Sequence, residues 1–244
     1  SCENLLYDHL QQYKNMKLSS KTIIAGNIVF AMIMNYISFF EDSLSMNTEP
    51  LILELHSCVQ HIPGSSSMSK ILFYKKKAEE IIFKLINRSV TDSWFYSPSR
   101  KKRHPDPLNC LMNYGNYILF TLCQITVRSK GLHPGLGFFY NNNTGTSLVC
   151  DIMEPFYFRV TRLILRMIHQ GKITKNHFIR SNTGWQLSHD GIMDFTRAFE
   201  GELLSIMPGD QSCLKNLIDA QVFCIYDWVK NGNPVRIYTR ERVR

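Results

Sequence analysis

The sequence has 244 residues, of which 44% are hydrophobic and 20% are charged, so it is long enough for one large domain or two small ones. This composition excludes wholesale disorder, and 13 Gly with 9 Pro exclude a collagen-like or low-complexity chain. The 28 Lys and Arg exceed the 20 Asp and Glu, and the net charge of +8 favours a nucleic-acid partner. The seven Cys form no C-x-x-C pair and no secretory signal opens the chain, so we expect a reducing, cytoplasmic location.

The first third of the chain predicts four helices. Apolar residues recur with the helical period over 4–17 and 20–41, Pro50 opens a helix to about His61, and a fourth helix covers 69–86. The apolar stretch 23–40 is long enough to be considered as a membrane span. It contains Asn27 and Asn35, which are costly in hydrocarbon without a partner. We therefore predict a helix buried in a protein core and no membrane association.

The remaining two thirds also follow the helical period. The segment 89–105 is polar, basic and irregular, and Asp106 with Pro107 then predicts the start of a helix that ends near Gly131. A compact turn over 133–145 precedes a long helix that Gly171 ends, and two or three helices follow. We predict an all-α fold in a single helical domain over 1–244. Its parts are the leading helices (1–88), a basic loop (89–105), the core (106–205) and a C-terminal helix with a basic tail (206–244).

Two tight basic clusters, at 75–77 and 100–103, predict contact with DNA phosphates, because hardly any acidic residue lies among their basic residues. We predict that these clusters and Arg162 bind duplex or branched DNA, although a plain solvated surface is the alternative for the clusters. The predicted DNA-binding residues are Lys75, Lys76, Lys77, Arg100, Lys101, Lys102, Arg103 and Arg162.

Asp151 and Glu154 are a candidate metal-binding pair. Residues at i and i+3 of a helix project toward one face, where two carboxylates can hold a hard divalent cation. Such a pair is also common on exposed helices, so the spacing alone is weak support. The sequence contains no G-x-S-x-G, no P-loop and no H-E-x-x-H motif.

Four strings in the centre of the chain resemble the CRISPR-associated spacer-acquisition integrase family. They cover 100–109, 111–119, 131–140 and 147–156, and the similarity extends back to the first helices and, more loosely, to about residue 205. The resemblance implies the helical C-terminal lobe of that family, without the β-rich N-terminal domain with which its members begin. It also implies DNA as substrate, a homodimer or association with other CRISPR adaptation subunits, and a role in antiviral defence.

The metal site of that family is changed here. The resemblance implies three metal ligands: a Glu, a His and a late acidic residue. Alignment on Ala78 places Lys75 at the Glu, and alignment on 136–138 places Tyr140 at the His, so that only Glu154 is retained. An ammonium repels a cation, and a phenol that ionises near pH 10 is a poor replacement for imidazole. We therefore expect no cofactor, and a catalytically degenerate DNA-binding subunit with a structural or regulatory role.

Two alternatives remain open at this stage. The first is an active integrase or endonuclease, in which Mg²⁺ or Mn²⁺ promotes attack of a 3′-hydroxyl on a phosphodiester. The metal would then be held by Glu79 or Glu80 together with Asp151 and Glu154. The second alternative is a helical protein–protein interaction module, in which the basic clusters bind an acidic partner.

Overall fold

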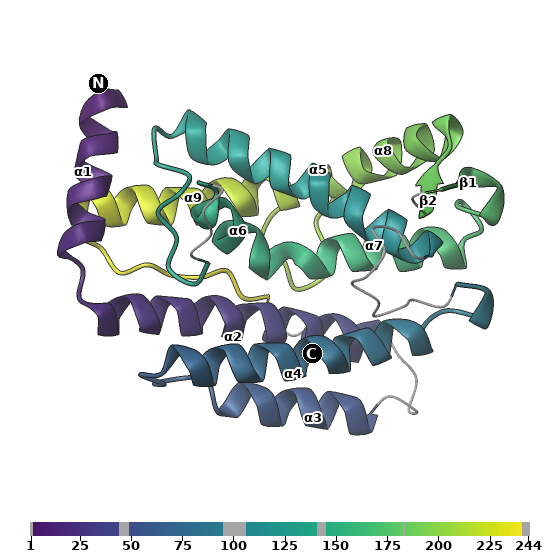
Figure 1. The fold of residues 1–244 in the computed structure, drawn as a ribbon, viewed down its shortest axis with the longest axis horizontal. Coiled ribbons are helices and arrows are strands. Elements are labelled where there is room, and N and C mark those ends of the chain that lie inside the picture. The colour runs from purple at the N-terminus through teal and green to yellow at the C-terminus, as the bar shows by residue number, and fades with distance from the viewer. Residues whose placement is uncertain (1, 44–48, 95–105, 141–144, 183, 241–244) are drawn as a thin grey trace.

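The protein is built from helices in two layers, with one small β-hairpin at one end (Figure 1). The computed structural model describes residues 2–43, 49–94, 106–140, 145–182 and 184–240. Its helices are α1 (Cys2–Asn15), α2 (Leu18–Ser43), α3 (Glu49–Gln60), α4 (Met68–Arg88), α5 (Pro107–Ser129), α6 (Ser147–Met153), α7 (Tyr157–His169), α8 (His189–Leu204) and α9 (Leu214–Asn231). The hairpin is β1 (Phe178–Ser181) with β2 (Gly184–Leu187), and short 3-10 turns are η2 (Asp92–Trp94), η3 (Glu154–Phe156) and η4 (Lys175–His177).

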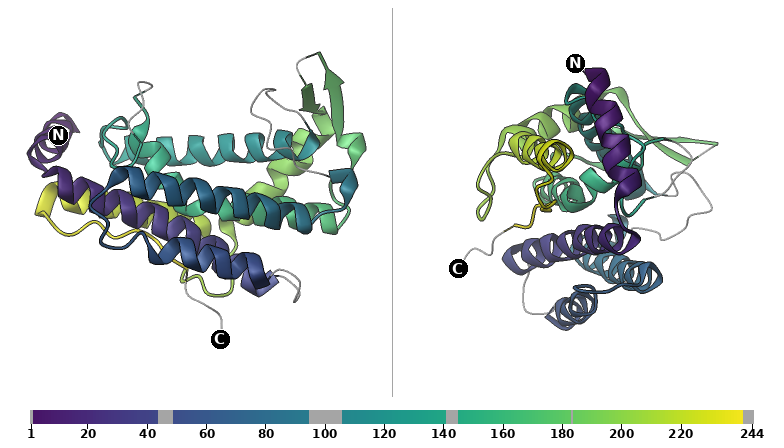
Figure 2. Two further views of the ribbon diagram at one scale, coloured as in Figure 1. Left: turned by 60° about the horizontal axis from the view of Figure 1, so that its bottom comes forward. Right: turned by 90° about the vertical axis from the view of Figure 1, so that its left-hand side faces the viewer.

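The two layers meet along α2. Helices α2, α3 and α4 pack against one another and form one layer, which the end-on view of Figure 2 separates clearly from the rest. Helices α5 to α9 form the other layer, and α1 packs against α9. Because α2 also contacts η3 and α7, it joins the apolar cores of the two layers.

Helix α2 is buried as a core helix, as predicted. By length and composition it could cross a membrane, but 78% of its apolar window is buried inside the protein. The fully buried Asn35 has partners: its amide nitrogen donates to the carbonyl oxygen of Pro155 at 2.8 Å, and its side-chain oxygen accepts from the backbone N–H of Arg240 at 2.7 Å. These bonds remove the cost of burying a polar amide.

The predicted helix-end signals in the second layer are also confirmed. The Asp106 side chain caps α5 by accepting from the backbone N–H of Asn109 at 2.7 Å, and Pro107 is the first helical residue. Gly131 follows α5 with φ 71°, and Gly171 follows α7 with φ 64°. Both positions need the left-handed conformation that glycine adopts without strain.

Two features differ from the predicted all-α fold. The antiparallel hairpin β1–β2 was not predicted, because strands of four residues are too short for a clear alternation of apolar and polar residues. The helix predicted from 147 to 170 is divided into α6 and α7 by the turn η3. Pro155 lies in this turn, and a proline inside a helix removes a backbone N–H and clashes with the preceding turn.

Candidate functional site

The buried carboxylate of Glu154 is the centre of the candidate site. Glu154 lies in η3 and is 1% exposed. One of its oxygens lies 2.9 Å from the Lys75 ammonium of α4, and the other accepts a 2.6 Å hydrogen bond from the Tyr140 hydroxyl. The Glu154 carboxylate is thus in direct contact with an ammonium from α4 and with a phenol that lies 14 positions earlier in the chain. These are the three positions at which the sequence resemblance implies metal ligands.

Lys75 is held between two carboxylates. It lies on the inward face of α4, is 5% exposed, and also pairs with Glu79 one helical turn later. Burial alone would lower the pKa of Lys75, but the negative charges of Glu154 and Glu79 outweigh burial and raise it. The side chain is therefore a charged ammonium that bridges the two carboxylates.

The Tyr140 hydroxyl is a donor. Burial, followed by the charge of Glu154, raises the pKa of Tyr140 far above its ordinary value. Burial also raises the pKa of Glu154, while Lys75 and the Tyr140 hydroxyl oppose that shift. The hydroxyl thus keeps its proton and donates it in a hydrogen bond, so it offers no phenolate oxygen to a cation.

Asp151, the other member of the predicted metal pair, has its carboxylate engaged by the backbone of the segment that carries Tyr140. Its carboxylate accepts from three successive backbone N–H groups: that of Phe138, that of Phe139 at 3.2 Å and that of Tyr140 at 2.9 Å. Burial raises the pKa of Asp151 to about 7, and the three N–H donors oppose that shift.

Gly137 permits this close approach of the loop to α6. A Cβ added at Gly137 would lie 2.7 Å from Ser147 and 2.9 Å from the Asp151 carboxylate. The missing side chain thus lets the loop reach the Asp151 carboxylate, and Asp151 in turn positions Tyr140.

The side chains at this site do not fit a divalent cation. Mg²⁺ and Mn²⁺ need several oxygen or imidazole lone pairs directed at one point. Both oxygens of Glu154 are already paired, the Lys75 ammonium has no lone pair to offer, and Tyr140 donates its proton. In the part of the chain that the structure describes, no group of three His, Cys, Asp or Glu is arranged to hold a metal.

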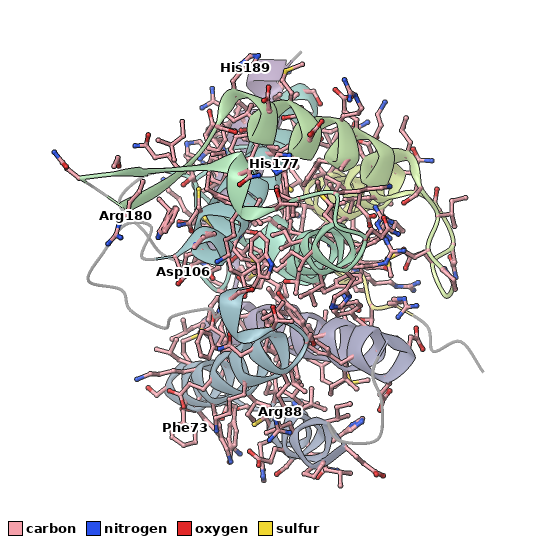
Figure 3. All side chains as sticks on the ribbon, turned by 90° about the vertical axis from the view of Figure 1, so that its right-hand side faces the viewer. Phe73, Arg88, Asp106, His177, Arg180 and His189 are labelled. Carbon is pink, nitrogen blue, oxygen red and sulfur yellow. The ribbon has the colours of Figure 1, made fainter. Side chains whose placement is uncertain are left out.

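The predicted DNA-binding residues are not in one environment. Lys76 and Lys77 are exposed on α4, whereas Lys75 is buried in the ion pairs above and is unavailable to a phosphate, contrary to our expectation. The basic cluster Arg100, Lys101, Lys102 and Arg103 lies outside the described residues. Figure 3 views the end of the molecule where Arg180 lies on the hairpin β1–β2, which projects from the helical body.

Arg162 differs from the expected free DNA contact. One of its guanidinium nitrogens lies 2.9 and 2.7 Å from the two carboxylate oxygens of Glu202. Glu202 and the buried Arg159 belong to an ion-pair network that our sequence reasoning missed. The available signal was the spacing of Arg159, Arg162 and Arg166 at i, i+3 and i+7, which places three guanidiniums along one side of α7.

Solved structures with the same arrangement of helices include a casposase and Cas1 proteins. A casposase bound to integration product matches with a TM-score of 0.84 at 18% identity, over 100% of this chain and 73% of that one. A partial Cas6-RT-Cas1–Cas2 complex matches with a TM-score of 0.85 at 18% identity, over 98% and 73%. A Cas1 protein from Thermotoga maritima gives 0.79 at 20% identity, over 98% and 73%. The chain therefore shares its fold with 73% of each of these three structures.

Sequence comparison agrees with the fold. The family described as CRISPR associated protein Cas1 matches residues 5–201, and the chain belongs to this family. A CRISPR-associated endonuclease Cas1 from Thermotoga maritima is 28% identical over 142 residues, which cover 57% of this chain and 44% of that protein. A Thermus thermophilus Cas1 endonuclease is 27% identical over 144 residues, which cover 58% and 45%. The chain thus matches less than half the length of these relatives.

Proposed function

We propose that this Cas1-family chain binds DNA without catalysing strand transfer or cleavage, as a structural or regulatory subunit. The observation that carries the proposal is the contact of Lys75 with Glu154. The ammonium lies 2.9 Å from the one acidic residue that remains of the implied metal ligands. The ammonium places one positive charge beside the carboxylate that a divalent cation would otherwise contact.

The contacts that Asp151 and Glu79, the alternative metal ligands, already make also support the proposal. An active site built on Asp151 would need its carboxylate, but that group already accepts from three backbone N–H groups. Glu79 is directed at Lys75 rather than at a shared cation position. Removing these contacts to admit a metal would leave buried polar groups unpaired, at a cost of about 1–3 kcal/mol each.

DNA as the partner is supported by charge and by the relatives. The chain carries a net charge of +8, and Lys76 and Lys77 are exposed. A casposase with this fold is bound to integration product, and Cas1 proteins with this fold occur in complexes with Cas2. We extend both partner classes, DNA and other adaptation subunits, to this chain as part of the proposal. When basic side chains neutralise DNA phosphates, the counterions of the DNA are released, so the affinity falls steeply as the salt concentration rises.

The test combines a strand-transfer assay with DNA binding across a salt series. The unmodified protein should bind duplex or branched DNA and should give neither integration nor nicking in Mg²⁺ or Mn²⁺. Changing Lys101, Lys102 and Arg103 together to Ala should lower both the affinity and the salt slope. A matched triple change of the exposed Lys14, Arg197 and Lys215 to Ala controls for net charge. Metal-dependent nicking that Glu154→Ala abolishes would overturn the proposal, as would salt-independent or absent DNA binding.

A further inference from the structure

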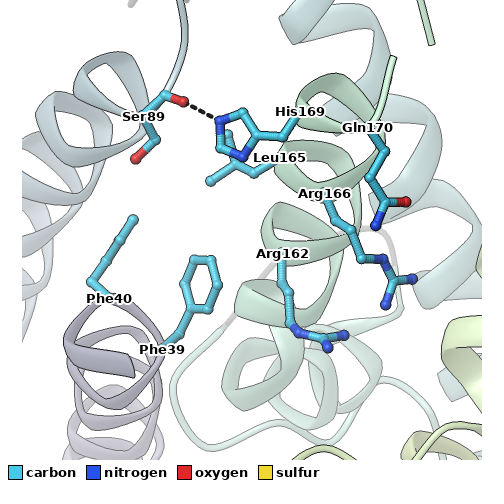
Figure 4. Close-up of a pocket in the computed structure, with 8 residues that line it drawn as sticks. All are labelled: Phe39, Phe40, Ser89, Arg162, Leu165, Arg166, His169 and Gln170. Carbon is cyan, nitrogen blue, oxygen red and sulfur yellow. Dashed lines mark hydrogen bonds between the residues drawn. The ribbon is translucent and has the colours of Figure 1, made fainter. Parts of the chain in front are cut away.

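A pocket lies where the C-terminal ends of α2, α4 and α7 meet (Figure 4). Its volume of about 290 Å³ is close to the lower end of the range for small-molecule sites. None of its lining residues belongs to the cluster of Lys75, Tyr140 and Glu154. The lining residues are Phe39, Phe40, Ser89, Arg162, Leu165, Arg166, His169 and Gln170.

Two guanidiniums of this pocket share one acidic partner. The side chains of Arg162 and Arg166 are 24% and 35% exposed, and each has a nitrogen close to the same oxygen of Glu202, at 2.7 and 3.1 Å. Glu202 is itself 1% exposed, and its other oxygen lies 2.8 Å from the Nε of the buried Arg159. One buried carboxylate is therefore the shared ion-pair partner of three guanidiniums.

The surrounding network does not balance this charge. Arg159 also pairs with Asp210, and Asp210 is shared with Arg240, which in turn pairs with Asp42. Within the described ion pairs of this network, four guanidiniums thus share three carboxylates. An excess positive charge in a partly desolvated place attracts an anion more strongly than the same charge in bulk water does.

The pocket offers hydrogen-bond donors as well as positive charge. A guanidinium has five N–H donors, and Arg162 and Arg166 each direct only one nitrogen to Glu202. Planar guanidiniums match phosphate oxygens well, since two N–H groups can bind two oxygens at once. On the α2 side of the pocket, Phe39 and Phe40 present apolar rings (Figure 4).

His169 of α7 lines the pocket and contacts the end of α4. Its Nε2 lies 2.7 Å from the Ser89 carbonyl oxygen. This contact joins the two helices at the pocket and holds the imidazole in one orientation.

We propose that this pocket binds the phosphate group of a nucleotide, with Arg162 and Arg166 as the phosphate ligands and the sugar or base toward Phe39. The phosphate is supplied by a free nucleotide or by the end of a DNA strand. The site is separate from the candidate site at Glu154, so it can exist whether or not that site is catalytic.

Isothermal titration calorimetry at low salt tests the proposal. The ligands titrated into the protein are inorganic phosphate, dAMP, and one short single-stranded oligonucleotide with and without a 5′-phosphate. Arg166→Gln and Arg162→Gln should each weaken dAMP binding about tenfold or more, because each removes a charge-assisted contact. Arg166→Lys should retain part of the affinity. Arg197→Gln is the matched control, because Arg197 lies on α8 with its side chain 76% exposed.

The two sources of phosphate give different results. Preference for the 5′-phosphorylated oligonucleotide, lost in Arg166→Gln, identifies a DNA end, whereas dAMP binding without that preference identifies a free nucleotide. The proposal is wrong if the folded protein binds neither phosphate nor dAMP, or if both Gln variants bind as the unmodified protein does. The Lys101, Lys102 and Arg103 triple variant should bind dAMP normally, which separates failure here from failure of the proposed DNA binding.

Discussion

The Lys75 ammonium and the Glu154 carboxylate are 79 positions apart in the sequence and 2.9 Å apart in the fold. Both side chains are buried, and the Tyr140 hydroxyl completes the contact from a third segment. In a medium of low dielectric constant the two charges depend on each other, because either one alone would be costly. An internal ion pair therefore occupies the place where the resemblance implies a metal.

Removing one member of this pair should destabilise the protein strongly. Glu154→Gln leaves the buried Lys75 ammonium with Glu79 as its acidic partner, and we expect a loss of about 1.5–3 kcal/mol in the free energy of unfolding, the range for a hydrogen bond to a charged group. The double change Lys75→Met with Glu154→Gln should cost less than the sum of the two single changes. Urea unfolding of the four proteins measures this coupling, and strictly additive effects would contradict the ion pair.

Restoring the implied ligands should restore metal affinity. Lys75→Glu with Tyr140→His removes the ammonium and adds a carboxylate and an imidazole beside Glu154. Mn²⁺ should then raise the melting temperature by several degrees relative to EDTA, since a ligand that binds only the folded state stabilises it by mass action. Lys76→Glu with Tyr140→His is the control, because Lys76 is exposed on the same helix. An equal Mn²⁺ response in both variants would contradict the assignment of Lys75.

The Asp151 carboxylate should hold the backbone of 138–140 in place. Asp151→Asn keeps the shape but replaces one acceptor oxygen with a donor, so at least one of the three backbone N–H groups loses its partner. We expect a loss of about 1–3 kcal/mol in the free energy of unfolding. Hydrogen exchange should accelerate first at the amides of Phe138, Phe139 and Tyr140, while amides in the middle of α9 are the internal control. Unchanged exchange at these three amides would rule out this positioning role.

The buried His9 should make stability depend on pH. Its Nδ1 accepts from the backbone N–H of His133 at 3.1 Å, and burial, then the charge of His133, lowers its pKa from 6.5 to about 4. The unfolded chain therefore binds more protons between these two values, so stability is complete above pH 6.5 and falls as the pH drops toward 4.

From pH 7.5 to pH 5 we expect a loss of about 2 kcal/mol from this group. Urea unfolding at the two values measures it, with His9→Gln as the variant in which the loss should shrink. His56→Gln is the control, because His56 is only half-buried, with Glu41 beside it. A pH dependence that is equal in all three proteins would show that His9 does not cause it.

The sequence by itself determined most of the helices and the resemblance to the family. Periodicity and local end signals such as Asp106 with Pro107 depend on residues within a few positions, so they can be read without the fold. The resemblance, read through Ala78 and the strings 131–140 and 147–156, also implied Lys75, Tyr140 and Glu154 as one set, and the fold brings these side chains together.

Only the tertiary structure decided what each charged group does. The spacing of Asp151 and Glu154 could not show their partners: the Asp151 carboxylate accepts from backbone N–H groups at 138–140, and the Glu154 carboxylate pairs with Lys75. Arg162 looked like a free cation in the sequence, yet Glu202, 40 positions later, is its partner. The charge state and partners of a buried group depend on which distant segments surround it, and that information is absent from local spacing.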